Sequence, residues 1–408
     1  MEFSVIVTIG SMAHLEKINA EFFKPYLTVL KYFRCTGIDI FNERNVFLYK
    51  FKYTPVIILL CLIITAFNHW RYVIEAIYSG TDLLELAGDI SFCYNAIESP
   101  LIYLHLILIK GKIRNYVFKL EKLWRNDDSL RPNEILLKRD QVKQIDSYQR
   151  IYCFLLGAYI HFYFGIPLLI ILIKKILKRD VLYLTPMKFT LPFDYQNNIV
   201  LFVIFYLFDY SIIWKMGYVV LGSLFFMSVS MNQLRTLFIL LQEDFKEIIK
   251  AKDADIDVKL KQTIQKHSTL LDMLAQLGDA YGAIFAIHVF FLCITICFYG
   301  IAAKINSRLS DLKNLMASVI ITVNIYHCCK HGQLATDSAV DVATAIYDSP
   351  WEDLSCSNRK IILLIILRSQ RATYIRSTSF TEISLKTFKM IMNTTYSFIS
   401  LLTKMYEK

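Results

Sequence analysis

The chain has 408 residues, of which 55% are hydrophobic, and its mean hydropathy is +0.42. Soluble domains are less apolar, at about 45–50% even when glycine is counted, so we exclude a soluble protein and predict an integral membrane protein. The net charge of +10 is typical of basic loops beside membrane spans, and we expect no nucleic-acid partner.

The chain begins with a mixed segment, residues 1–52, which we assign to the cytoplasm and the membrane interface. Its apolar start lacks a basic beginning, so a cleaved signal peptide is not expected. Further on, the run from Phe22 to Tyr26 suggests a short helix that lies at the interface.

Seven apolar spans follow and predict an all-α integral membrane protein. We place them at about 54–72, 83–109, 148–173, 199–229, 280–303, 312–329 and 383–402. Residues 53–229 then form a bundle of spans one to four, and residues 280–331 hold spans five and six.

Lysine and arginine are distributed unevenly between these spans. Seven lie in residues 1–52, ten in 110–146, seven in 230–279 and six in 330–376, whereas the alternate loops mostly carry fewer. Because basic loops remain in the cytoplasm, we predict a cytoplasmic N-terminus and an extracellular C-terminus. A G-protein-coupled receptor has the opposite orientation.

The second of the inside loops, residues 230–279, is predicted to be helical rather than flexible. Apolar residues recur there at helical spacing, at Leu234, Leu237, Phe238, Leu241, Phe245, Ile248 and Ile249, and again at Leu260, Ile264, His267, Leu271 and Leu274. We expect helices that extend spans four and five into a cytoplasmic anchor, which residues 332–382 complete.

Signals for an enzyme or a metal site are weak. His327 and His331 have the spacing of metal ligands on a helix, but no glutamate completes an H-E-x-x-H pattern. Cys293 and Cys297 share a helix face, and buried small hydrophobes are the simpler interpretation. We therefore expect no enzyme, no cofactor and no metal.

Four charged residues inside the spans leave a transporter open as an alternative function. They are Asp89, Glu98, Asp209 and Lys215. A transporter also favours internal repeats or a proton relay, and the sequence has neither pattern.

Aromatic residues gather in the outer halves of spans three and four. Taken singly they indicate ordinary packing, but as a set they can line a cavity for a small hydrophobic ligand. Our candidates for ligand contact include two residues of span six and are Gly157, His161, Phe164, Phe202, Phe205, Tyr206, Met316 and Val319.

The last span, residues 383–402, is rich in hydroxyl side chains and follows a short apolar run at 361–367 and a basic break. Such polarity in a membrane helix indicates a face toward a partner helix or toward water. Asn393, Ser397, Leu401 and Lys404 share one face of this helix.

The order of small motifs in the last 80 residues resembles the insect odorant receptor family. The motif residues near span six are Cys328, Gly332, Ser338, Ala345, Tyr347 and Trp351, and those of the last helix are Thr387, Phe388, Thr395, Tyr396, Ser397 and Phe398. Many members have a basic residue where this chain has Asn393.

The resemblance implies a ligand-tuned subunit of an odorant-gated cation channel. Members assemble as heterotetramers with an obligate co-receptor, bind volatile ligands, and work in the plasma membrane of olfactory sensory neurons. The last helix would be split into an anchor half and a pore half at 383–408, with Tyr347 and Trp351 packed in the anchor. By position, Leu401 resembles the hydrophobic gate. A gustatory receptor-type channel stays open as an alternative.

Overall fold

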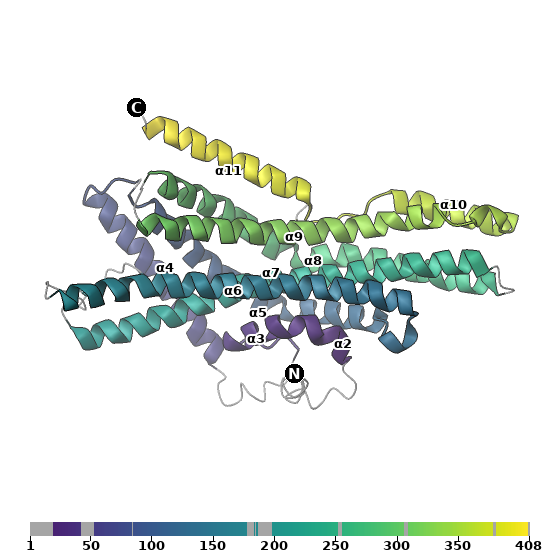
Figure 1. The fold of residues 1–408 in the computed structure, drawn as a ribbon, viewed down its shortest axis with the longest axis horizontal. Coiled ribbons are helices and arrows are strands. Elements are labelled where there is room, and N and C mark those ends of the chain that lie inside the picture. Colours follow the sequence, from purple (N-terminus) through teal and green to yellow (C-terminus); the bar gives the residue numbers. More distant parts are fainter. Residues whose placement is uncertain are drawn as a thin grey trace.

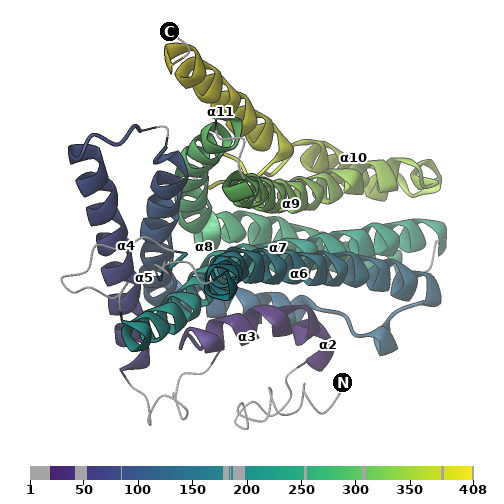
Figure 2. The ribbon, with the colours of Figure 1, turned by 60° about the vertical axis from the view of Figure 1, so that its left-hand side comes forward.

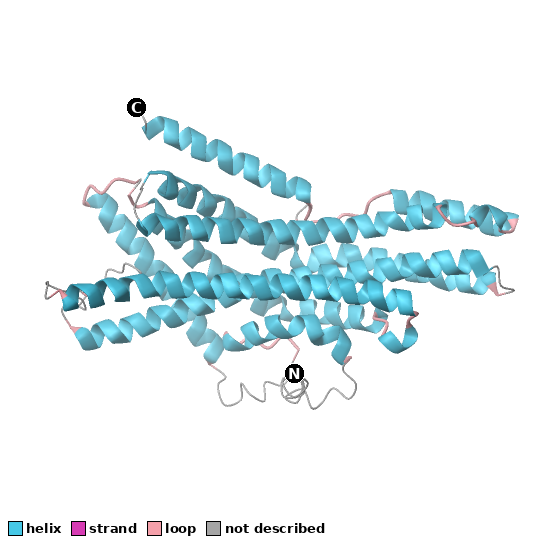
Figure 3. Cartoon of the chain, in the orientation of Figure 1, coloured by secondary structure: helices cyan, strands magenta, loops and turns pink. Residues whose placement is uncertain are grey.

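The computed structural model describes residues 19–41, 53–83, 85–177, 183, 185–186, 198–251, 255–305, 309–377 and 381–406. The described residues are helical, with short loops and no strand beyond an isolated bridge between Arg376 and Glu382 (Figure 3). An all-α chain is therefore confirmed.

The elements run from the N-terminus to the C-terminus as Figure 1 labels them. They are α2 (Ala20–Phe23), η1 (Lys24–Tyr26), α3 (Leu27–Cys35), α4 (Thr54–Tyr78), α5 (Ala87–Leu123), η2 (Asp127–Ser129), α6 (Pro132–Ile176), α7 (Ile199–Ala251), α8 (Ile256–Ile305), α9 (Leu309–Tyr347), η3 (Trp351–Asp353), α10 (Cys356–Gln370) and α11 (Leu385–Tyr406).

Five of these helices, α4 to α8, are long and apolar enough to cross a membrane. The sixth and seventh predicted spans fall on α9 and α11, which are not among those five. Both helices carry many polar residues, so their assignment as spans depends on their place in the bundle rather than on hydropathy alone.

The helices extend well beyond the predicted spans. α7 has 53 residues and α8 has 50, which correspond to about 80 and 75 Å at 1.5 Å per residue. A bilayer core is about 30 Å thick, so more than half of each helix projects from it. The predicted extension of spans four and five is confirmed (Figure 1).

The predicted N-terminal helix is present, and its aromatic residues are buried within the protein. Phe22 and Tyr26 are fully buried against the bundle. The ring of Tyr26 lies 5.0 Å from that of Phe226, and its hydroxyl is 3.0 Å from the Ser230 hydroxyl. The hydrophobic effect thus holds this segment against α7. Figure 2 shows α3 below α7, and the two helices are in contact.

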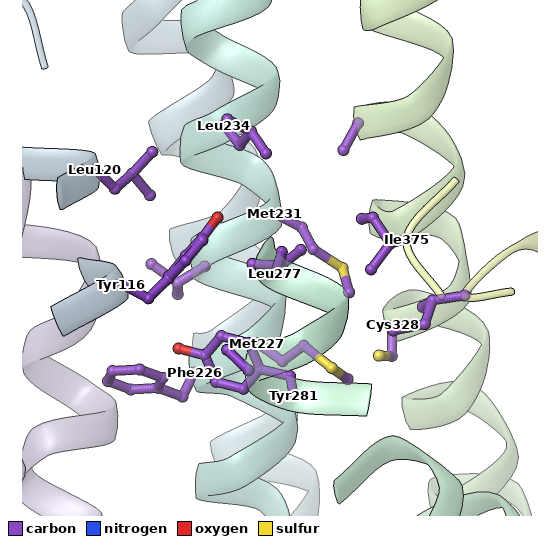
Figure 4. Packing of buried hydrophobic residues seen from close by; sticks show 14 of the residues in the cluster. Tyr116, Leu120, Phe226, Met227, Met231, Leu234, Leu277, Tyr281, Cys328 and Ile375 are labelled. Atoms are coloured by element: carbon purple, nitrogen blue, oxygen red, sulfur yellow. The ribbon is translucent and has the colours of Figure 1, made fainter. Parts of the chain in front are cut away.

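One main hydrophobic core extends from the apolar spans into the parts of the helices that lie beyond them. In its centre, aromatic, methionine and aliphatic side chains of α5, α7 and α8 meet Cys328 of α9 and Ile375 of the segment before α11 (Figure 4). Met227 and Met231 are fully buried there, and flexible thioethers of this kind fill irregular gaps between helices.

The anchor consists of the projecting parts of α7, α8 and α9 together with α10. Ile362 and Ile366 of α10 are buried, as are Phe245 of α7 and His267 of α8. The His267 ring lies 6.4 Å from Phe245, and its Nε2 is 3.3 Å from the Ser369 hydroxyl. The predicted apolar stripes therefore pack against one another and against α10.

His267 makes the stability of the anchor depend on pH. Burial, with a smaller contribution from the nearby Arg368, lowers the pKa of His267 from 6.5 to about 4. As the pH falls, His267 is protonated in the unfolded chain before it is protonated in the folded chain. The free energy of unfolding therefore decreases between about pH 6.5 and pH 4, by up to about 3 kcal/mol in total.

We expect His267→Gln to flatten this pH dependence. The measurement is thermal unfolding of the purified protein between pH 7 and pH 4.5, followed by tryptophan fluorescence. The exposed His161 provides the control, since His161→Gln is expected to retain the wild-type slope. Equal slopes for His267→Gln and wild type would contradict the assignment.

Candidate functional site

A compact aromatic cluster lies between the ends of α6 and α7 that are farthest from the anchor. Its four buried members are Ile160, Phe164, Phe202 and Tyr206. The surrounding half-buried residues come from α5, α6, α7 and the connection between α6 and α7, and are Phe92, Leu156, Tyr159, Tyr163, Ile171, Tyr183, Tyr210, Ile213 and Trp214.

Phe164 meets two rings of the cluster edge to face, at 5.5 Å and 89° from Tyr206 and at 5.3 Å and 85° from Tyr210. The Phe202 ring lies 5.4 Å from that of Tyr206 in a tilted arrangement. Such pairs stabilise the packing beyond their buried area. The Tyr206 hydroxyl donates to the Phe164 carbonyl, which fixes α7 against α6.

The predicted ligand-contact residues lie in different environments in the structure. Phe164, Phe202 and Tyr206 come together in the buried centre. Gly157 lies beside Trp214, so that a Cβ there would be 3.7 Å from the indole. His161 is exposed at the rim, with Nδ1 2.6 Å from the Gly157 carbonyl and Nε2 3.4 Å from the Tyr210 hydroxyl.

The remaining candidates lie outside the buried centre. Phe205 and Met316 are half-buried, and Val319 is 52% exposed. Ile160 and Trp214 are cluster residues that the prediction omitted. Helical spacing could have identified both residues. Ile160 is four residues before Phe164 and Trp214 is four residues after Tyr210, so each shares a helix face with an aromatic residue of the cluster.

The charged residues inside the spans have two different environments. Glu98 is buried and accepts from His288 at 2.6 Å, and the other ring nitrogen of His288 is 2.8 Å from the Ser223 hydroxyl. Lys215 donates to the Ser211 hydroxyl at 2.5 Å. By contrast, Asp209 is completely buried, and neither carboxylate oxygen has a hydrogen-bond partner among the described residues.

The two weak metal-site signals have packing explanations. His327 stacks on Tyr148 with 4.2 Å between the ring centroids. The Cys297 thiol points to the Thr395 carbonyl of α11 at 3.7 Å. Within the described residues, no group of three or more His, Cys, Asp or Glu side chains is placed to hold a metal ion.

The last helix, α11, packs mainly on α8 and α9 and leaves one face uncovered (Figure 1). Thr387, Ile391 and Thr395 are buried against the bundle. On the opposite face, the four predicted pore residues are all exposed in the single chain, and Leu401 is 55% exposed. They are Asn393, Ser397, Leu401 and Lys404.

The anchor residues named from the sequence also differ in exposure. Tyr347 at the end of α9 is 68% exposed in the single chain, whereas Trp351 in η3 packs against the main core. Of these two residues, only Trp351 therefore contributes to packing within a single chain.

Two glycines allow the segment between α10 and α11 to approach the bundle closely. A Cβ on Gly282 of α8 would collide with the Ser377 carbonyl, and one on Gly332 of α9 with the Ile383 carbonyl. The Ser377 hydroxyl donates to the Gly282 carbonyl at 2.7 Å. Because the obstructing atoms are backbone, the start of α11 depends on these glycines for its position.

Comparison with known proteins gives a consistent family. The sequence profile described as "7tm Odorant receptor" matches residues 82–396. Odorant receptor 85c of Drosophila melanogaster is 26% identical over 150 residues, which are 36% of this chain and 39% of that receptor. Odorant receptor 22c of the same fly is 28% identical over 173 residues, or 42% and 43% of the two chains. The aligned stretches thus span less than half of these relatives.

A solved structure has the same fold over nearly the whole chain. The insect olfactory receptor OR5 from Machilis hrabei in complex with eugenol superimposes with a TM-score of 0.75. The match covers 93% of this chain and 97% of that chain at 16% identity. At this identity the likeness concerns the fold, and it confirms the predicted seven-span membrane architecture.

Substitution of Gly332 by alanine is expected to displace the start of α11. Overpacking of this kind costs about 1–3 kcal/mol, so the thermal stability of the purified protein should fall. The control is Gly111→Ala in α5, because a Cβ at Gly111 meets nothing within 4 Å. There the better helix propensity of alanine should stabilise by about 0.5–1 kcal/mol. Equal effects of both changes would refute the close approach.

Proposed function

This chain belongs to the 7tm odorant receptor family, and we propose that it is the odorant-tuned subunit of a ligand-gated cation channel. It is a multi-pass membrane protein with a receptor fold. The observation that best supports the channel is the uncovered face of α11, which carries Asn393, Ser397 and Lys404 beside Leu401.

A polar helix face is costly in lipid and in a dry core, and water is its favourable neighbour. If four chains place their α11 helices around one axis, these faces line a common aqueous pore. We propose that the other subunits are an odorant receptor co-receptor and that the complex is a heterotetramer. The exposed Tyr347 would then lie at a contact between subunits.

Leu401 is the proposed gate of this pore. It is an exposed apolar residue near the end of α11, on the face of Asn393 and Ser397, and lies three residues before Lys404. A ring of leucines can stop ions by excluding water from the constriction, and a small widening then restores conduction. Ligand binding would favour the wider arrangement by stabilising it relative to the closed one.

The aromatic cluster of α6 and α7 is the proposed binding site for a small volatile ligand. It is partly buried and consists mainly of apolar and aromatic side chains, which also line most sites for small ligands. The eugenol complex of the Machilis receptor is a precedent for a small aromatic ligand in this fold. Phe164, Phe202 and Tyr206 are the residues that we expect to contact it.

The proposal includes an orientation and a location. Basic residues favour an N-terminus in the cytoplasm, with residues 230–279 and 332–382 forming the cytoplasmic anchor and the pore half of the chain at 383–408. The complex would work in the plasma membrane of olfactory sensory neurons.

The deciding experiment is electrical. Cells that express this chain with a co-receptor are exposed to a panel of volatiles while whole-cell current is recorded. We expect a cation current that requires both chains and at least one ligand. Signalling that needs a G protein and passes no current through the complex would overturn the channel.

For the gate, we expect Leu401→Ala to produce current without ligand. The smaller side chain removes the apolar constriction, so the closed pore retains water. The control is Leu402→Ala, because Leu402 faces Ile301 and Ala302 of α8 rather than the uncovered side. Leu402→Ala should lower thermal stability and leave the ligand-free current unchanged, and the reverse result would reject Leu401 as the gate.

A further inference from the structure

Asp209 is the buried ionisable group that the packing of the spans does not explain. It lies on the inward face of α7, where Phe202, Tyr206, Asp209 and Ile213 follow one another at helical spacing. The side chain has 0% exposure, and both carboxylate oxygens lack a partner among the described residues. Leaving a buried polar group unsatisfied destabilises the folded chain, and more so when the group is charged.

Three described donors on α6 and α7, in the part of the bundle that holds Asp209, are engaged elsewhere. The Tyr206 hydroxyl donates to the Phe164 carbonyl, and the Tyr163 hydroxyl donates to the Pro186 carbonyl at 3.0 Å. Lys215 is two turns further along α7 and donates to Ser211. The described residues thus leave two acceptor positions for a donor that arrives from outside.

The carboxylate also lies beside the proposed ligand cluster. Tyr163 and Tyr206, on α6 and α7, are within electrostatic range of it. The ring of Tyr163 already accepts a cation, because the Lys313 ammonium of α9 lies 5.1 Å from its centroid. Aromatic faces around a carboxylate are the surroundings that stabilise a bound ammonium group.

We propose that Asp209 binds the nitrogen of a volatile amine in the aromatic cluster. This inference rests on the proposed function, since it names the chemical class of ligand for the same site. An ammonium group pairs directly with the carboxylate. A neutral amine takes the proton of a carboxylic acid, so that an N–H bond forms, an O–H bond breaks and the same ion pair results.

An amine suits Asp209 better than an alcohol does. A primary ammonium offers three donors and a positive charge, whereas a hydroxyl offers one donor and no charge. Charge-assisted hydrogen bonds are roughly twice as strong as neutral ones. The hollow next to the cluster, lined by His69, Asp89, Phe92 and Tyr163 among others, holds only about 10 Å³. A ligand therefore enters by displacing side chains, and a strong polar contact offsets that cost.

The test uses three ligands of equal heavy-atom count, namely 2-phenylethylamine, 2-phenylethanol and propylbenzene. Current is measured as a function of concentration for wild type and for Asp209→Asn, each coexpressed with the co-receptor. We expect Asp209→Asn to raise the half-maximal concentration of the amine by about tenfold or more and to change that of propylbenzene less than threefold. The control is Asp272→Asn, which alters an exposed carboxylate of the anchor.

Three results would overturn the amine site. They are an unchanged amine response in Asp209→Asn, an equal loss for all three ligands, and a loss for the alcohol as large as that for the amine. If Asp209→Asn does not reach the cell surface, thermal stabilisation of the purified wild-type protein by each ligand decides, because binding raises the unfolding temperature. There the amine must stabilise more than both analogues.

The same stabilisation measurement separates the two proposals. Stabilisation by the amine together with an absence of any ligand-evoked current would reject the channel and retain the Asp209 site. Ligand-evoked current with no preference for the amine would reject the Asp209 site and retain the channel.

Discussion

The structure depends on the mutual packing of α7, α8 and α9, which run side by side and continue from the apolar spans into the anchor (Figure 1). Every other long helix contacts at least one of these three. Within these helices the backbone N–H and C=O groups pair with one another, so their apolar side chains can pack where water is absent. Close packing then makes the three helices respond as one unit to a displacement at either end.

This arrangement also specifies how the aromatic cluster can influence the last helix. α6 carries half of the cluster and holds α9 through the Tyr148 hydroxyl, which donates to the Asn324 side chain at 2.8 Å. Two residues further along α9, the Tyr326 ring lies 5.4 Å from Phe388 of α11. α9 therefore contacts both α6 and α11. If the aromatic cluster binds the proposed ligand, a shift of α6 can reach the start of α11 through these side chains.

Much of the fold could be predicted from sequence because it follows from hydrophobic periodicity. The stripe through Leu234, Phe238 and Phe245 indicated a helix that continues beyond the membrane, and α7 does so for 53 residues in total. The exposed face of α11 was likewise visible as a spacing of polar residues. These are properties of one helix at a time, which a linear pattern can encode.

What the sequence could not supply is the direction of a side chain relative to another helix. His161 and Phe164 are three residues apart, yet one is exposed at the rim and the other is 3% exposed in the centre. Phe22 and Tyr26 have the composition of an interfacial helix, and their complete burial within the bundle was not predicted. The close approach at Gly332 also involves a carbonyl fifty residues away, which no local spacing reports.

The buried charges of the spans differ in whether the described residues satisfy them. Glu98, His288 and Ser223 come from α5, α8 and α7 and hydrogen-bond to one another, which ties the three helices together. Asp209 is equally buried, but no described donor reaches it. Selection for stability alone would replace such a carboxyl with an apolar residue, because the unsatisfied group lowers the free energy of unfolding. The described residues do not compensate this cost, whereas a ligand that donates to Asp209 would do so, and this is the physical basis of the proposal that Asp209 takes part in recognition.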